Sequence, residues 1–463
     1  MDNVTVVILA AGLGTRMKSK KAKVLHQAGG MPLIGHVVTA AANAVPRERI
    51  FVVVGHQAEL VEAAVRDRGV RFVQQPEQLG TGHAAAVCRE SVEPLGGDVV
   101  ILYGDCPLLS CSTIERLIEV RRKANAAMAV ITTVIEDPTG YGRILRGADG
   151  SVDAIVEHKA ATPAQLAIRE INSGIYSFRS ELLWKHLGEI GRDNPAHEYY
   201  LPDIVAIFRR QGYLVEPLLL EDPAEVLGIN TRGELAQVDA LFRMRKVRQA
   251  MAEGVTVERP ETVTIDAEVE IGADTVIEPF ARLLGHTVIG EDCHIGACSI
   301  VRDSTLAAQV EVLPFTSIES SHIAAHAHIG PYARLRMNAR VKAGARVGNF
   351  VEMKNAVLGE GSKSQHLAYL GDATIGDGAN IGAGTITCNY DGQRKHRTTI
   401  GDGVFIGSNS TLVAPIEIAE GSYVAAGSVV TEPVPADALA LGRARQVNKE
   451  GWARKRREAR SGQ

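Results

Sequence analysis

The feature that most constrains this chain is a six-residue repeat in its C-terminal half. Aliphatic side chains recur at every sixth position, and the first run comprises Ile265, Ile271, Ile277, Leu283, Ile289, Ile295 and Val301. With shifts of phase, the same spacing returns at 329–353, 375–381 and 400–430. Amphipathic strands of a β-sandwich repeat every two residues, so they do not explain a period of six. The repeat predicts a parallel β-helix, in which each hexad supplies one short strand and points its aliphatic side chain into a narrow core.

The largest shift of phase marks an insertion between Ile381 and Ile400. It contains the segment 387–397, which we expect to leave the repetitive scaffold. Segments of this kind often carry function, but a simple surface excursion gives the same sequence signal. Both interpretations stay open on this signal alone.

The N-terminal half alternates between apolar runs and helical patterns. Continuous β-branched and apolar runs lie at 4–9, 50–54 and 99–103, and helical spacing lies between them at 33–45 and 82–91. This order predicts a mostly parallel, Rossmann-like α/β sheet with helices on both faces. Ligands of such sheets bind beyond the carboxyl ends of the strands.

A glycine-rich turn with two cations follows the first predicted strand. Gly12 and Gly14 lie in the turn, and Arg16 and Lys23 come after it. Met17 stands where a dinucleotide fingerprint has its third glycine, and the Gly-Lys-Ser/Thr ending of a P-loop is missing. A tight turn without a ligand is one alternative. Exposed backbone N–H groups next to two cations suit phosphate oxygens, so we interpret the turn as a nucleotide-phosphate site.

Asp105 follows the third apolar run in the sequence Tyr103-Gly104-Asp105. A carboxylate at the end of a strand that faces a phosphate loop is a natural Mg²⁺ ligand. Asp beside Gly is more often a turn or helix-capping residue. The motif taken alone does not decide between the two.

One long helix is expected to join the two halves. Thr231 and Glu234 form a capping box, apolar residues follow at spacings of three and four, and Gly254 is a suitable residue to end the helix. Asn230 lies just before this helix, so the joint is also a candidate for a metal ligand.

Composition limits the classes of function. The 463 residues predict two or three domains. A net charge of −4 and 5% aromatic residues give no basic field and few stacking platforms, which argues against nucleic acid as a partner. The six cysteines are scattered without a CxxC pair, which argues against a zinc site and a disulfide framework and suits a reducing cytoplasm. The N-terminus lacks the features of a signal peptide, and no run reads as transmembrane, so we expect no membrane insertion.

Several motifs of the N-terminal half resemble one enzyme family, the bacterial bifunctional N-acetylglucosamine-1-phosphate uridyltransferase/glucosamine-1-phosphate acetyltransferases. The matching motifs are Leu9–Met17 with Lys23, Gln75 with Gln78–Gly82, Tyr103–Asp105, Gly140–Arg143, Val156–Lys159 and Glu170–Gly174. One departure is Ala22, where the family has Pro before the lysine. The resemblance implies a domain of UTP-dependent uridyl transfer at 1–229.

The resemblance also implies a role for each matching position. Arg16 and Lys23 would stabilise the α-phosphate and the departing pyrophosphate, and Asp105 and Asn230 would bind Mg²⁺. The residues that would bind UTP and UDP-N-acetylglucosamine are Leu9, Ala10, Gly12, Gly14, Lys23, Gln75, Gly80, Thr81, Tyr103, Gly104, Asp105, Gly142, Glu157, Asn172 and Asn230. A sugar phosphate is already a competent nucleophile, so positioning and charge neutralisation are enough for this chemistry.

The C-terminal half resembles the acetyltransferase part of the same family. The matching stretches are Gly348–Lys354, His366–Asp372, Asn380–Thr385, Cys388–Gly392 and Lys449–Trp452. The resemblance implies that the β-helix is left-handed and that His366 is the general base that deprotonates the attacking amine. It implies a sugar-phosphate site at Arg336, Lys354, Tyr369 and Asn380, and an acetyl-CoA site at Ala383, Asn389, Tyr390, Ser408, Ala426 and Arg443.

The leading hypothesis is therefore a bifunctional enzyme with a linker helix at 230–254, a β-helix at 255–453 and a basic, disordered tail at 454–463. It would acetylate glucosamine 1-phosphate and then couple the product to UTP, which feeds envelope synthesis (peptidoglycan and lipid A). The resemblance also implies a homotrimer. Two alternatives are a nucleotidyltransferase whose β-helix is only a scaffold, and a non-catalytic nucleotide-sugar sensor. His366 and Lys354 speak against the scaffold, and Asp105, Lys23 and Arg16 speak against the sensor.

Overall fold

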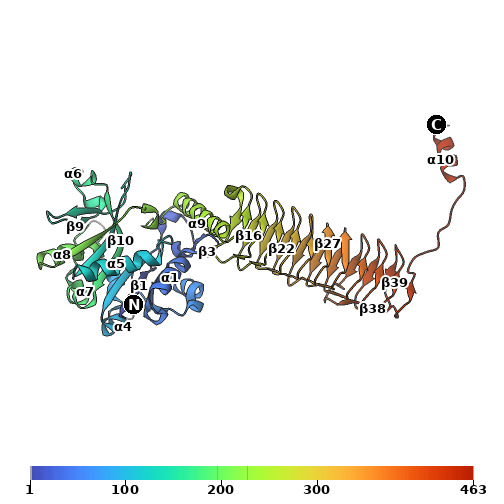
Figure 1. Cartoon of the computed structure of the whole chain (residues 1–463), viewed down its shortest axis with the longest axis horizontal. Coiled ribbons are helices and arrows are strands. Elements are labelled where there is room, and N and C mark those ends of the chain that lie inside the picture. Colours follow the sequence, from blue (N-terminus) through green and yellow to red (C-terminus); the bar gives the residue numbers. More distant parts are fainter. Residues whose placement is uncertain (1–2, 195–196, 227, 462–463) are drawn as a thin grey trace. The chain divides into compact units, whose positions relative to one another are not determined.

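The computed structural model describes residues 3–194, 197–226 and 228–461 (Figure 1). The chain divides into two compact units, Met1–Phe242 and Arg243–Gln463. The division falls inside the helix α9 (Arg232–Ala252). None of the helices in the described ranges is long and apolar enough to cross a membrane.

The first unit is built on one mixed sheet. Its strands follow the order β11 (Val215–Leu220), β7 (Met128–Val134), β10 (Glu170–Arg179), β6 (Asp98–Tyr103), β1 (Val4–Leu9), β4 (Ile50–Val54) and β5 (Arg71–Gln74). β8 (Arg143–Arg146) and β9 (Val152–Val156) form an antiparallel pair beside β10. The expected α/β sheet is confirmed, with one difference. β10 runs antiparallel to both β6 and β7, while β1 is parallel to β4 and β6.

Helices cover both faces of this sheet because β1 is apolar on both sides. Val6 and Ile8 pack in a core with α1 (Leu33–Ala44), α2 (Ala58–Val65) and α5 (Cys111–Lys123). Val7 and Leu9 pack in the opposite core with α3 (Thr81–Ala86), α4 (Arg89–Val92), α7 (Ser180–His186) and α8 (Ile204–Arg210). The helix expected at 82–91 is therefore two short helices, α3 and α4. The unit also holds β2 (Gln27–Ala28), β3 (Met31–Pro32) and α6 (Pro163–Leu166).

The linker helix α9 begins and ends as its capping signals predict. The backbone N–H of Glu234 donates to Thr231 Oγ1, and Glu234 Oε2 accepts from the N–H groups of Thr231 and Asn230. At the other end Gly254 adopts a positive φ of 96°, and the N–H of Val255 returns to the carbonyl of Ala250. These are the two hydrogen-bonding patterns that close helix termini.

The second unit is built on three parallel sheets, and successive strands of the chain join these sheets in turn (Figure 1). The first sheet contains β12 (Thr256–Val257), β15 (Val276–Ile277), β18 (His294–Ile295), β21 (Glu311–Val312), β24 (His328–Ile329), β27 (Arg346–Asn349), β30 (Lys363–His366), β33 (Asn380–Ile381), β36 (Phe405–Ile406), β39 (Tyr423–Val424) and β41 (Leu439–Ala440). The second contains β13 (Thr264–Ile265), β16 (Arg282–Leu284), β19 (Ile300–Arg302), β22 (Ser317–Glu319), β25 (Arg334–Arg336), β28 (Glu352–Lys354), β31 (Tyr369–Gly371), β34 (Ile386–Cys388), β37 (Thr411–Val413) and β40 (Val429–Val430). The third contains β14 (Glu270–Ile271), β17 (Val288–Ile289), β20 (Thr305–Leu306), β23 (His322–Ile323), β26 (Arg340–Val341), β29 (Val357–Leu358), β32 (Ala373–Ile375), β35 (Thr398–Ile400) and β38 (Ile416–Ile418).

The strand order confirms the predicted parallel β-helix, and its hexapeptide coils are consistent with the left-handed form. Up to β40, neighbours within a sheet are three strands apart in the chain, so each of these coils supplies one strand to each sheet, and only β39 and β41 at the end of the first sheet are two apart. The aliphatic residue of each hexad lies directly over that of the next coil, as Ile277 does over Ile295 and Ile295 over Val312. These side chains are buried in one continuous core. One inward side chain per short strand is enough to fill so narrow an interior.

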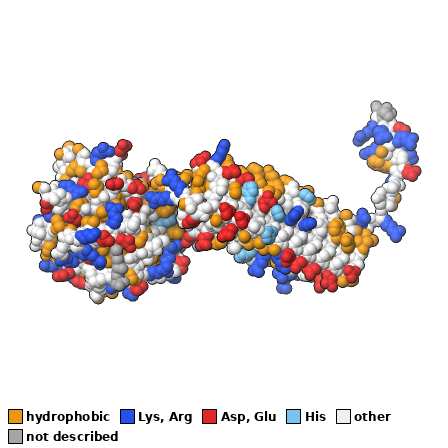
Figure 2. Space-filling model, in the orientation of Figure 1, with side chains coloured by type: hydrophobic (Ala, Val, Ile, Leu, Met, Phe, Trp, Pro, Cys, Tyr) orange, Lys and Arg blue, Asp and Glu red, His pale blue; other side chains and the backbone are white. Residues whose placement is uncertain are grey.

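Two segments depart from the regular coils. The predicted insertion leaves the β-helix between β34 and β35, where Tyr390 and Lys395 form an isolated antiparallel bridge. Most of the tail predicted at 454–463 lies in the helix α10 (Trp452–Ser461), and residues 462–463 lie outside the described part of the chain. Ala, Arg, Lys and Glu are good helix formers, and Arg456 stacks on the Trp452 ring at 5.4 Å. Basic side chains cover this helix in Figure 2.

Candidate active sites

A cavity of about 490 Å³ opens at the carboxyl end of β1. Ten of the residues that the sequence predicts for nucleotide binding line it, namely Leu9, Ala10, Gly12, Gly14, Lys23, Gln75, Gly80, Thr81, Tyr103 and Asp105. They come from the ends of β1, β5 and β6 and from the start of α3. The structure thus gathers side chains that are nearly 100 positions apart in the sequence into one pocket.

The glycine-rich turn at Gly12 and Gly14, the predicted phosphate loop, is held in place by contacts that require glycine. Gly14 has a φ of 61°, and a side chain there would come within 2.6 Å of Lys23 Cβ. The loop is anchored at its base, because the N–H of Ala10 donates to Val53 and the N–H of Gly104 donates to Leu9. Gly104 itself packs closely between Ile34 and Val24. This loop conformation brings Lys23 into the lining of the pocket.

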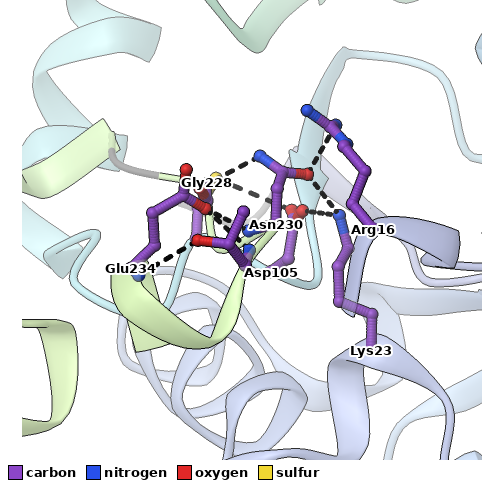
Figure 3. Close-up of polar contacts among 8 residues, drawn as sticks. Arg16, Lys23, Asp105, Gly228, Asn230 and Glu234 are labelled. Atoms are coloured by element: carbon purple, nitrogen blue, oxygen red, sulfur yellow. Dashed lines mark hydrogen bonds and ion pairs between the residues drawn. The ribbon is translucent and has the colours of Figure 1, made fainter. Parts of the chain in front are cut away.

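Two cations and two oxygen ligands meet at one side of this pocket (Figure 3). The Lys23 ammonium forms an ion pair with Asp105 and lies 3.1 Å from Asn230 Oδ1. Arg16 donates to the same Asn230 oxygen at 2.7 Å. Asn230 is positioned from the other side, since its N–H donates to Glu234 at the start of α9. The linker helix therefore positions one of the two predicted metal ligands.

The donor set of this cluster fits a hard divalent cation. Asp105 offers a carboxylate and Asn230 an amide oxygen, which are the ligand types that Mg²⁺ takes. The described residues contain no group of three or more Cys, His, Asp or Glu side chains suited to a metal. Mg²⁺ in nucleotide sites uses one or two protein ligands together with phosphate oxygens, so two ligands are enough here.

The opposite end of the pocket is shaped by a segment that the sequence reasoning missed. Gly80 and Gly82 lie against the backbone of Tyr199, whose N–H donates to Leu79. The N–H of Leu201 donates to Thr81 Oγ1 at 3.0 Å, and Glu198 lines the cavity. Gln75 is buried and donates to the Gly80 carbonyl at 3.2 Å. No periodicity marks the 198–201 segment, so only the run of aromatic residues could have singled it out.

Gly142, directly before β8, and Glu157, directly after β9, form a second cluster with Asn172 of β10. A side chain at Gly142 would meet Glu157 Oε1 at 3.3 Å and Asn172 Cβ at 3.5 Å. Asn172 is buried and donates to the Tyr176 hydroxyl at 2.8 Å. Burial, with a smaller contribution from Asp203, raises the pKa of Glu157. The absence of a side chain at Gly142 leaves the polar groups of this cluster accessible to a ligand.

In the β-helix, five predicted or neighbouring site positions stack along one corner. Asn349, His366, Ala383, Ser408 and Ala426 each lie two residues after the inward residue of their strand in the first sheet. Backbone hydrogen bonds connect the cofactor positions, from Asn409 to Ala383 and from Gly427 to Ser408. Asn349 and His366 are paired in adjacent coils, and their side chains are 2.9 Å apart. The predicted base and three predicted acetyl-CoA positions thus share one straight line.

The residue that follows each of these positions changes in size at the coil of His366. In the coils up to His366 it is mostly bulky, with Phe280, Phe315, Tyr332, Phe350 and Leu367, all at positive φ and about half exposed. Phe315 and Tyr332 stack at 5.1 Å, and Tyr332 and Phe350 at 5.3 Å. In the three coils after His366 the position is Gly384, Asn409 and Gly427. The side chains at this corner position are therefore mostly large in the coils up to His366 and small or absent in the three coils after it.

The predicted sugar-phosphate residues lie on the second sheet. Arg336 and Lys354 are cross-strand partners on β25 and β28, and Tyr369 is on β31. Arg336 donates to Glu352 at 2.7 Å. Asn380 is on β33 of the first sheet, beside Lys363 of the strand that carries His366.

The insertion adds one cation, Lys395, that was not assigned from the sequence. Lys354 lies close to Lys395 and lowers its pKa. Although burial opposes it, hydrogen bonds from Asn355 and Asn389 and the nearby lysines lower the pKa of Asp372. Asn389 is buried, whereas Tyr390 is exposed and donates only to Gly392 within the loop. The insertion thus brings a further cation to Lys354 and is more than a surface excursion. Arg443 lies beyond β41, with its Cδ 4.0 Å from a side chain placed at Gly427.

Comparisons with known proteins agree with both sites. The family model of the MobA-like NTP transferase domain matches residues 6–169, and the bacterial transferase hexapeptide model matches 268–303 and 397–432. The Bifunctional protein GlmU of Solibacter usitatus (strain Ellin6076) is 58% identical over 98% of this chain and 98% of its own length. Those of Koribacter versatilis (strain Ellin345) and Shouchella clausii (strain KSM-K16) are 51% and 44% identical, each over 98% of this chain and over 97% and 100% of their own lengths.

Near-complete coverage at this identity confirms the family that the motifs predict, in both halves of the chain. The chain belongs to the family of bifunctional GlmU proteins and is a bifunctional enzyme, with an N-terminal nucleotidyltransferase domain and a C-terminal hexapeptide acyltransferase domain.

Proposed function

We propose that the enzyme makes UDP-N-acetylglucosamine in two steps. The β-helix transfers an acetyl group from acetyl-CoA to the amine of glucosamine 1-phosphate and releases CoA. The N-terminal domain then transfers uridyl from UTP to N-acetylglucosamine 1-phosphate and releases pyrophosphate. The observation that carries this proposal is the grouping of ten predicted nucleotide-binding residues around one cavity of about 490 Å³. The domain limits we propose are 1–229, 230–254 and 255–453.

In the uridyltransferase site the cavity would hold the nucleotide. The backbone of Gly12 and Gly14 would approach the phosphates, and Gln75, Gly80 and Thr81 would contact the base. Gly142, Glu157 and Asn172 would hold the N-acetylglucosamine group. The sugar phosphate attacks the α-phosphorus and the bond to pyrophosphate breaks, so no proton has to be removed. Arg16 and Lys23 would stabilise the charge on the transferring and leaving phosphates.

Asp105 and Asn230 would hold Mg²⁺ in this site. The bound ion would neutralise charge on the phosphates and fix their orientation. The chemistry of the two donors supports Mg²⁺, and so do their contacts with Lys23 and Arg16, the cations proposed to bind the phosphates.

In the acetyltransferase site His366 would accept a proton from the attacking amine. The amine nitrogen bonds to the thioester carbon, the carbon–sulfur bond breaks, and CoA leaves as the thiol. Asn349 accepts a hydrogen bond from one ring nitrogen of His366 and so leaves the other free to take that proton. Arg336, Lys354 and Lys395 would neutralise the sugar phosphate, with Tyr369 and Asn380 beside them.

Acetyl-CoA would lie along the low part of the corner, past Ala383, Ser408 and Ala426 towards Arg443, with Asn389 and Tyr390 of the insertion beside it. Glycine at 427 supports this position, because a side chain placed there would have no neighbour closer than Arg443 Cδ at 4.0 Å, so its absence leaves room beside Ala426. The stacked and exposed rings of Phe315, Tyr332 and Phe350 support the association of several copies of the chain, which we propose to be a homotrimer.

An assay of the purified chain with glucosamine 1-phosphate, acetyl-CoA, UTP and Mg²⁺ tests the whole proposal. The CoA thiol should appear first and pyrophosphate should follow. Omission of acetyl-CoA should suppress both signals, and N-acetylglucosamine 1-phosphate should restore pyrophosphate alone. Pyrophosphate without any CoA release from glucosamine 1-phosphate would favour the alternative in which the β-helix is only a scaffold.

A further inference from the structure

The two oxygen atoms that would bind the metal are both engaged by one side chain. The Lys23 ammonium pairs with Asp105 Oδ2 and lies 3.1 Å from Asn230 Oδ1 (Figure 3). Arg16 reaches the same oxygen of Asn230 at 2.7 Å. A cationic group therefore occupies the position from which a metal ion would contact both ligands.

This arrangement is built into the local packing. The side chains of Lys23 and Asp105 are 17% and 12% exposed, so solvent screens their contact little. Gly14 packs on Lys23 Cβ and sets the direction of the side chain. The amide of Asn230 donates to Gly228 at 3.2 Å, which keeps its oxygen turned towards the two cations.

An ammonium group and a dication cannot share these oxygens. Mg²⁺ binds oxygen at about 2.0–2.1 Å, so a bound ion would lie well within repulsive distance of an ammonium that stays on the same carboxylate. A bound triphosphate would offer Lys23 a second partner, because its oxygens are negatively charged and would lie in the cavity that Lys23 lines. Entry of metal and nucleotide together would therefore exchange one partner of Lys23 for another.

From these contacts we infer that Lys23 competes with the metal ion for Asp105 and Asn230. Without nucleotide, Lys23 holds the two ligands and weakens the binding of free metal. When metal enters with the triphosphate, Lys23 leaves the carboxylate and turns to the phosphates. The inference rests on the proposed metal site and adds that metal and nucleotide bind in a coupled manner.

Binding of Mn²⁺ to the full-length chain without nucleotide, followed by electron paramagnetic resonance, tests the competition. Lys23→Met removes the charge at nearly constant length and should tighten Mn²⁺ binding by about tenfold or more. Lys23→Gln keeps a hydrogen-bond donor for Asp105 and guards against a folding defect, and it should tighten binding in the same direction. Lys21→Met, at an exposed lysine two positions away, removes an equal charge and should change the affinity by less than about twofold.

Three results would overturn the inference. They are unchanged or weaker Mn²⁺ binding in both Lys23 variants, equal tightening in Lys21→Met, and no measurable binding in any variant. Asp105→Asn separates this failure from a failure of the metal site. If Asp105→Asn abolishes Mn²⁺ binding while Lys23→Met does not tighten it, the metal site stands and the competition is wrong. If Asp105→Asn leaves Mn²⁺ binding intact, the proposed metal site is wrong as well.

Discussion

Asn349 and His366 occupy equivalent positions in consecutive coils, and Asn349 Oδ1 accepts a hydrogen bond from His366 Nδ1 at 2.9 Å. The amide oxygen fixes the ring so that Nε2 carries the free lone pair. Asn349→Ala should therefore lower kcat of acetyl transfer about 10- to 100-fold with little change in either KM. Steady-state kinetics on both substrates measure this. Asn349→Asp retains an acceptor oxygen and should restore most of the rate, and failure to do so would speak against the positioning role.

His366→Ala tests the assignment of the general base. Acetyl transfer to glucosamine 1-phosphate should fall about 100-fold or more, because the attacking amine loses its proton acceptor. Uridyl transfer from UTP to N-acetylglucosamine 1-phosphate should persist, since His366 belongs to the second unit. Parallel measurement of CoA thiol and pyrophosphate on one preparation gives both rates. A near wild-type acetylation rate would show that another group is the base.

Asp105→Ala is the matching test in the first unit. Mg²⁺-dependent uridyl transfer should fall about 100-fold or more, because Asp105 is the charged member of the predicted pair of metal ligands and Asn230 is neutral. Acetylation should remain because it is proposed for the second unit, and the thermal unfolding of the variant reports on the folding of the first. Pyrophosphate release over a range of Mg²⁺ concentrations is the measurement. Full recovery of the rate at high Mg²⁺ would show that Asp105 contributes to the affinity for Mg²⁺ but not to the rate of the loaded enzyme.

Gly427→Phe tests the low part of the β-helix corner. The chain itself shows that an aromatic residue fits this conformation, since Tyr332 and Phe350 hold the same corner position at φ values of 56° and 57°. A ring at 427 should lie over the cofactor line and raise KM for acetyl-CoA about tenfold or more, without changing KM for glucosamine 1-phosphate. Gly403→Phe is a matched control, because Gly403 also has a positive φ and open space but lies at a different corner. Equal effects of the two variants would attribute the change to strain.

Glu157→Gln should stabilise the fold at neutral pH while it weakens binding of the sugar. Burial, followed by the charge of Asp203, raises the pKa of Glu157. The folded chain thus holds the Glu157 proton more tightly than the unfolded chain does, and the ionised carboxylate opposes folding. The opposition is complete above the folded pKa and disappears below the unfolded value near 4.5. The variant should gain about 1–4 °C in Tm at pH 7 to 8, and the gain should vanish as pH falls below 4.5. A gain that persists at low pH would contradict this cause.

The β-helix could be predicted from sequence because each short strand points a single side chain inwards. The period of six thus records the fold directly, and Ile277, Ile295 and Val312 lie over one another as that period requires. The phosphate loop was predictable for a similar reason, since Gly14 and Lys23 are close in sequence and the loop follows a buried strand.

Other parts depend on contacts that leave no local pattern. The antiparallel direction of β10 is set by its pairing with β6 and β7, far away in the chain. Tyr199 shapes the pocket through its backbone, which any residue could supply. The pairing of Lys395 with Lys354 arises only when the insertion folds back on the coils. The break from aromatic residues to glycine at His366 becomes visible only when the coils are stacked in register.

Stacking in register also places the residues of one corner at regular distances along the axis of the β-helix. Neighbouring coils are about 4.8 Å apart, so His366 and Ala426, three coils away on the same corner, are separated by about 14 Å along the axis. In the acetyl-CoA site that we propose, the length of the cofactor would correspond to a whole number of coils. Adding or removing one coil between these residues would lengthen or shorten the proposed cofactor site by a fixed step and would leave the chemistry at His366 as it is. A fold of this kind can adapt to a longer or shorter donor by counting repeats, with no redesign of its catalytic end.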